Sequence, residues 1–181
     1  MLLKTLIFTI AFGTQAVPTP SGKEPESASD RETRMHAIAD AVDLVSKTPG
    51  DAAAIITVWN RESNFSLWVH DGTIKADGGL AICMGSIHPS DHVPDWADLA
   101  GTSVENTALC AARTLQIVKS GYWMCGDNSQ TEKERMTYAF EYYARGHCAK
   151  PREESIVRSN MWVRLQARFY RAFSNGKKNT E

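Results

Sequence analysis

The chain has 181 residues, 43% of them hydrophobic, and its 20 Lys and Arg against 21 Asp and Glu give a formal net charge of -1. This length fits one folded domain with an apolar core and short tails. The balanced charge excludes an overall field that would attract nucleic acid or an anionic membrane, so neither is expected as a partner.

The first 16 residues are typical of an export signal. Lys4 precedes an apolar run at 6–12, and Thr14 and Ala16 place small residues where a signal peptidase reads. The run is shorter than the ~20 residues that cross a bilayer, and no Cys follows it to carry a lipid. We therefore expect a signal peptide at 1–16 and a secreted or periplasmic protein without a stable membrane anchor. The alternative is a disordered tag or a short anchor.

Residues 17–29 combine Pro, Ser, Gly and Glu with little apolar content, which is typical of a flexible leader. The domain is expected to span 30–174 and to be followed by a polar tail at 175–181. Apolar residues at helical spacing predict a mainly α fold with about five main helices and very little strand. In chain order, the helices are expected from near Asp30 to Thr48, from Asp51 to Glu62, after possible capping boxes at 102–105 and 131–134, and from Pro151 onward. Residues 71–80 are expected to form a loop or small irregular hairpin, and "ICMGSIHPS" a short helical turn before Pro89.

Glu62 is the candidate for chemistry because it continues the apolar stripe of Ile55 and Trp59. Burial disfavours the charged form of a carboxyl and raises its pKa, as a general acid for a glycosidic oxygen requires. The alternative is a carboxylate at a frayed helix end that faces solvent or pairs with Arg61 or Lys75. The helical pattern alone favours that alternative, since perturbed carboxylates are a minority.

Three ordered segments between about 50 and 150 resemble a known family. They are "AAIITVWNRESNF", "DGGLAICMGSIHPS" and "YYARGHC". The first two resemble the Glu-Ser and Gly-Leu-Met-Gln segments of the soluble lytic transglycosylase and goose-type lysozyme family. All three are similar to a branch of phage and bacterial lysozyme-like proteins. The resemblance implies a lysozyme-like fold with Glu62 as the single catalytic acid and base.

The resemblance also implies substrate-binding positions at Ser63, Ser86, His88 and Tyr143. Ser63 matches the serine after the family's Glu, although its hydroxyl could instead bond a carbonyl of the preceding helical turn. Ser86 stands where the family has Gln, which shortens the reach of that side chain. Ala144 replaces an Asn, and the Arg after it makes this wall of the expected cleft bulkier and more positive.

The implied activity is that of a peptidoglycan lytic transglycosylase, which cleaves the MurNAc to GlcNAc linkage. Glu62 would protonate the leaving oxygen and then deprotonate the sugar's own C6 hydroxyl, giving a 1,6-anhydro product. Three alternatives remain open: a hydrolysing lysozyme, a glycan-binding or secretion-accessory protein without chemistry, and a structural virion or appendage component. The expected partner is the peptidoglycan glycan strand, and no cofactor is expected.

The four cysteines are expected to form disulfides, because export places them in an oxidising compartment and no C-x-x-C pair is present. Three pairings are possible. We favour Cys83 with Cys110 and Cys125 with Cys148, which would tie the two cleft walls to the core. Each bridge would contribute roughly 3 to 4 kcal/mol in the chain-entropy model.

Other polar groups are interpreted as structural. Asp71 and Asp77 adjoin glycines and are expected to form turns rather than supply a second catalytic carboxylate. His88, Asp91 and His92 lack a helix to align them, so no metal site is expected and His88 is assigned to a turn or the cleft rim. The last helix carries a basic face that we expect to be solvated. Its members are Arg158, Arg164, Arg168, Arg171, Lys177 and Lys178.

Overall fold

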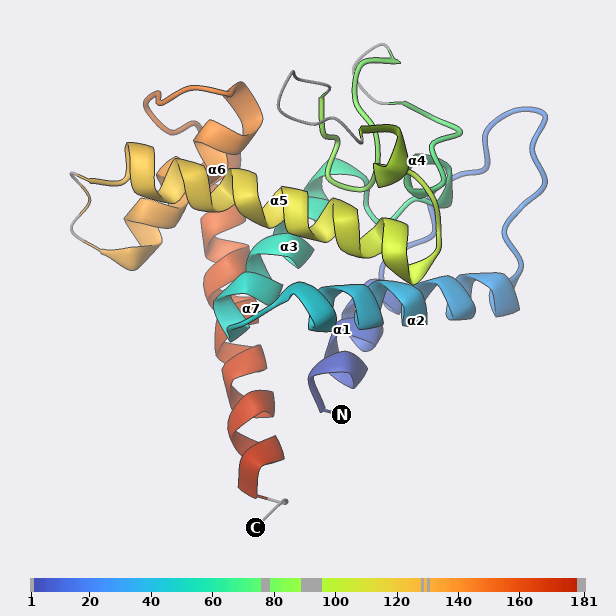
Figure 1. Ribbon diagram of the computed structural model, residues 1–181, viewed down its shortest axis with the longest axis horizontal. Helices are drawn as coiled ribbons and strands as arrows, with labels where there is room; N and C mark the ends of the chain where they lie inside the picture. The colour runs from blue at the N-terminus through green and yellow to red at the C-terminus, as the bar shows by residue number, and fades with distance from the viewer. Residues whose placement is uncertain (1, 76–78, 89–95, 128, 130, 179–181) are drawn as a thin grey trace.

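The computed structural model describes residues 2–75, 79–88, 96–127, 129 and 131–178. These residues form seven α-helices and contain no β-strand, so the mainly helical class is confirmed (Figure 1). An isolated antiparallel bridge joins Ile82 to Ile87. The helices are α1 (Leu2–Phe12), α2 (Ala28–Val45), α3 (Pro49–Glu62), α4 (Leu67–His70), α5 (Val104–Cys125), α6 (Glu132–Arg145) and α7 (Glu153–Lys178), with a short 3₁₀ helix, η2 (Trp96–Leu99), before α5.

The five expected helices are α2, α3, α5, α6 and α7, and the structure adds α1 and the short α4. The capping box of Thr131 and Glu134 is present at the start of α6. α5 begins one residue later than expected, because Ser103 rather than Thr102 caps it and accepts from the Asn106 backbone N–H at 3.1 Å. Local capping chemistry therefore sets these boundaries more closely than the apolar pattern does.

α3 is the central helix of the molecule. Thr48 caps it and Asp51, which we expected to be the cap, forms the reciprocal half of a capping box. Every residue from Ala52 to Trp59 is buried, so the helix is enclosed all round rather than along one stripe. It packs along α7 and against α5, which crosses in front of it in Figure 1. Glu62 thus stands where a buried helix emerges from the core.

The segment expected to be an export signal forms α1, which packs against α2 and α7. Leu3, Ile7 and Ala11 are buried, and Lys4 pairs with Asp40 at 3.1 Å. Cleavage after Ala16 would therefore uncover parts of α2 and α7. Among the described residues, no helix combines the length and the apolar character that crossing a membrane requires.

The part of the leader nearest the domain is anchored. Ser27 accepts from the backbone N–H of Asp30 at 3.1 Å, and α2 consequently begins at Ala28, before the expected start near Asp30. Glu26 accepts hydrogen bonds from Nε and Nη2 of Arg34 at 2.6 and 2.8 Å. These contacts fix the entrance to α2.

Both favoured disulfides are present, Cys83 to Cys110 and Cys125 to Cys148. The first ties the 81–88 turn to the early part of α5. The second ties the end of α5 to the segment between α6 and α7. The two bridges therefore link α5 at both ends to neighbouring segments.

Candidate functional site

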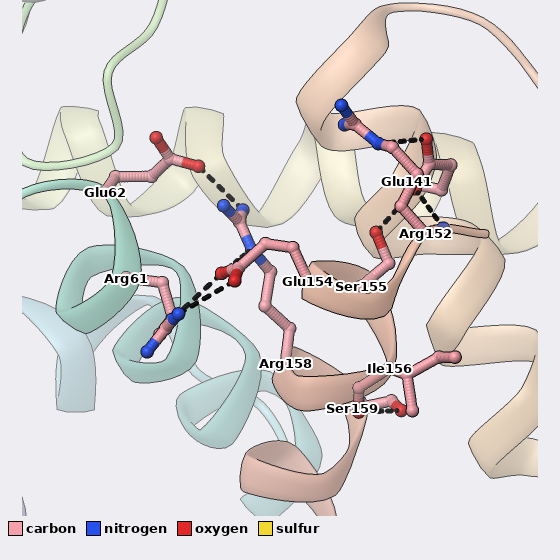
Figure 2. Close-up of polar contacts among 9 residues, drawn as sticks. All are labelled: Arg61, Glu62, Glu141, Arg152, Glu154, Ser155, Ile156, Arg158 and Ser159. Atoms are coloured by element: carbon pink, nitrogen blue, oxygen red, sulfur yellow. Dashed lines mark hydrogen bonds and ion pairs between the residues drawn. The ribbon is translucent and has the colours of Figure 1, made fainter.

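Glu62 is the last residue of α3, and its side chain is 21% exposed. Arg158 reaches up from α7 and brings Nη1 to 2.6 Å from Glu62 Oε1 (Figure 2). The contact is a charge pair that lacks the alignment of a hydrogen bond. The cation in contact with Glu62 is thus Arg158, which the sequence alternatives of solvent, Arg61 or Lys75 did not include.

Arg158 departs from the predicted solvated basic face of α7, because its side chain is only 7% exposed, whereas Arg164, Arg168 and Arg171 are exposed as predicted. Arg158 Nε donates to Glu154 at 3.3 Å, and Arg61 donates two bonds to the same carboxylate at 2.9 and 2.8 Å. The Arg61 hydrogen bonds and, to a smaller extent, the Arg158 charge lower the pKa of Glu154. Two arginines and two glutamates therefore join the end of α3 to the start of α7.

The surroundings of Glu62 are charged, whereas the apolar stripe predicted a dry, apolar pocket. The guanidinium of Arg158 contacts Glu62 Oε1 at 2.6 Å, so one side chain holds the carboxyl group in place.

Tyr143 of α6 lies close enough for the charge of Glu62 to act on it. Burial first and the Glu62 charge second raise the pKa of Tyr143, while Thr114 and Arg158 oppose the rise, so the phenol stays protonated. Its hydroxyl donates to the carbonyl of Gly85 at 2.5 Å. Trp59 Nε1 donates to Thr114 Oγ1 at 3.1 Å and so links α3 to α5, while the Tyr143 bond links α6 to the 81–88 turn.

The turn carrying Ser86 is held by close packing and an unusual backbone. A Cβ on Gly85 would lie 2.5 Å from Thr114 Oγ1 and 2.8 Å from the Tyr143 hydroxyl, so only glycine fits. Among the described residues, four non-glycine residues have positive φ: Asn64, Phe65, Cys83 and Ser86. Two directly follow the Glu62–Ser63 pair and two flank Gly85. Such residues cost on the order of 1–3 kcal/mol each and cluster at functional sites.

Three of the predicted substrate-binding residues meet in one groove of about 660 Å³. Ser86, His88 and Tyr143 line it, together with Arg145 at the end of α6 and Arg113 of α5. Glu62 does not line this groove and is connected to it through Tyr143. The positive wall expected from Arg145 is present.

Ser63 does not reach the groove. Its side chain is buried, and its hydroxyl donates to the carbonyl of Trp59 at 3.0 Å. This is the alternative in which the hydroxyl bonds a carbonyl of the preceding helical turn. Asp71 accepts from the Thr73 N–H at 2.8 Å and so forms the expected turn. Asp77, Asp91 and His92 lie outside the described residues. Within the described part of the chain, no three His, Cys, Asp or Glu side chains gather as a metal site.

Sequence reasoning missed another carboxylate, Glu141 of α6, which is fully buried. It accepts from Ser155 Oγ at 2.7 Å and from the backbone N–H and Nε of Arg152, both at 3.0 Å (Figure 2). Burial would raise the pKa of Glu141, but these bonds and the Arg152 charge outweigh it and lower the pKa. Glu141 thereby ties α6 to the first turn of α7.

A larger groove of about 830 Å³ is separate from these residues and is lined mainly by apolar side chains, including Trp123, Trp162 and Tyr170. It contains none of the predicted site residues. The candidate site is therefore the smaller groove together with Glu62 and Arg158. No family model matches this chain, and no curated protein or solved structure matches it significantly.

Proposed function

We propose that this helical domain is lysozyme-like and cleaves the MurNAc to GlcNAc linkage of peptidoglycan, with Glu62 as acid and base. The observation that carries the proposal is the position of Glu62. It ends a buried helix, is partly exposed and held by Arg158, and lies beside Tyr143 of a groove that also contains Ser86 and His88. Positive-φ residues on both sides of the site support the same assignment.

In the proposed reaction, a protonated Glu62 gives its proton to the leaving oxygen as the bond from C1 to that oxygen breaks. The resulting carboxylate is stabilised by Arg158 and takes the proton of the C6 hydroxyl as its oxygen bonds C1. The product is a 1,6-anhydro sugar, and water is not consumed.

We also propose that the protein is exported through residues 1–16 and meets its substrate in the periplasm or outside the cell. The two disulfides support an oxidising compartment. The apolar α1, with one lysine near its start, supports the signal assignment. N-terminal sequencing of the exported protein tests this, since cleavage would leave Val17 as the first residue and a retained Met1 would contradict it.

The experiment that tests the reaction is mass spectrometry of purified peptidoglycan digested by the wild-type protein. Transglycosylation predicts fragments lighter by one water than hydrolysis would give. Fully hydrated fragments would replace the proposal with a hydrolysing lysozyme. Intact glycan that still binds the protein would support a glycan-binding protein without chemistry.

A further inference from the structure

The charged side chains that line the groove beside Tyr143 are positive. The groove's ionisable side chains include two guanidiniums, from Arg113 on α5 and Arg145 on α6, and none of the described Asp or Glu residues lines it. The whole chain, in contrast, is almost neutral. Positive charge is therefore concentrated in the groove, although the chain as a whole is almost neutral.

Both guanidiniums retain hydrogen-bonding capacity. Arg113 donates to Gln116 through Nη1 at 2.6 Å, while its buried Nε has no hydrogen-bond partner among the described residues. An unpaired buried donor is costly, which favours a ligand that supplies an acceptor. Arg145 Nη1 lies 3.5 Å from Glu141, but that carboxylate already accepts from Arg152 and Ser155. The Arg145 side chain is 39% exposed and so available to a ligand.

Guanidiniums bind carboxylates through paired, charge-assisted hydrogen bonds. In peptidoglycan, the carboxylates are carried by the peptide substituents of the muramic acid residues, whereas a plain β-1,4-linked N-acetylglucosamine polymer has none. We propose that Arg113 and Arg145 bind these carboxylates, so that the groove selects acid-bearing glycan strands over uncharged ones. The inference deepens the proposed function and rests on it for the glycan, but not for the catalytic role of Glu62.

The test measures binding to the Glu62→Gln protein, so that bound fragments stay uncut. Three ligands of equal chain length are compared: peptidoglycan fragments with free carboxylates, the same fragments with those carboxylates amidated, and an N-acetylglucosamine oligomer. Amidation is expected to weaken binding about tenfold or more, as the loss of charge-assisted bonds implies, and the uncharged oligomer should bind equally weakly. Equal affinity for the free and amidated fragments would overturn the proposal.

Arg113→Met and Arg145→Met extend the test, because Met keeps the aliphatic bulk and removes the charge. Each substitution is expected to weaken the binding of fragments with free carboxylates about tenfold and to leave the binding of amidated fragments unchanged. Arg164→Met is the matched control, since Arg164 is exposed on α7 and its Nε donates to the Asn160 carbonyl of the same helix. An equal loss in the control would overturn the assignment to the groove.

The two proposals fail separately. Selective binding of free carboxylates by a protein that leaves glycan intact would refute the catalytic role and keep the groove assignment. Cleavage that depends on Glu62 but ignores amidation would do the opposite. Melting curves of the Met variants show whether these proteins still fold. The comparison with amidated fragments tests the same interaction without changing Arg113 or Arg145.

Discussion

Two glutamates face the beginning of α7, and their environments differ. Glu141 is fully buried and accepts from the Arg152 backbone, the Arg152 side chain and the Ser155 hydroxyl. Glu62 keeps 21% of its side chain exposed and has Arg158 as its contacting cation. The difference shows that burial alone does not identify a carboxylate as a catalytic group. Glu141 has its oxygens occupied by the protein, whereas Glu62 retains an exposed side for a substrate.

The sharpest test of this comparison is Glu141→Ala, which should destabilise the protein by about 3–5 kcal/mol, the cost of breaking a buried ion pair. Glu62→Ala should cost about 1 kcal/mol, because Arg158 keeps its bond to Glu154. Urea unfolding measures both. Equal losses would remove the distinction between a structural and an available carboxylate.

The second prediction concerns His70, a buried group whose charged form has no compensation. Burial first, and then the charge of Arg34, lower the pKa of His70 to about 3; Nε2 contacts Thr107 at 2.8 Å, while Nδ1 has no hydrogen-bond partner among the described residues. The unfolded chain binds the proton near pH 6.5 and the folded chain does not, so stability falls as pH drops below 6.5. The loss between pH 7 and pH 4 should be about 3 kcal/mol.

Urea unfolding across this pH range checks the His70 prediction. His70→Gln should reduce the slope of stability against pH, because Gln does not titrate. Protonation of Glu141 also destabilises the protein in acid, since its pKa is lowered in the folded state. This loss of stability occurs at lower pH than the His70 effect, below the ordinary pKa range of a carboxyl. An unchanged slope between pH 5 and 6.5 in His70→Gln would contradict the account.

The third and smallest effect is on the cleavage rate. Arg158→Met removes the side chain that contacts Glu62 Oε1 at 2.6 Å, so the rate should fall about tenfold because Glu62 loses its fixed position. Arg164→Met, on the exposed face of the same helix, should leave the rate unchanged. An unchanged rate in Arg158→Met would show that the ion pair does not position the acid.

Local patterns predicted much of the fold and part of the site. The α6 capping box, the end of α3 at Glu62 and both disulfides follow from residues at short range or in neighbouring segments. Arg158 was misassigned although a signal existed: it lies four residues before buried Trp162 and seven before buried Leu165, on the same helical face. Glu141 had no such signal, because its burial depends on the first turn of α7 crossing over α6.

The most direct test of the central claim is the clearance of purified cell walls by Glu62→Gln beside the wild type. Gln keeps the size of the side chain and cannot donate the acid's proton, so we predict a loss of at least ~10²-fold with a melting temperature close to that of the wild type. Glu105→Gln, an exposed glutamate at the start of α5, is the control and should clear walls normally. Wild-type clearance by Glu62→Gln would contradict the assignment of Glu62 as the catalytic acid and base.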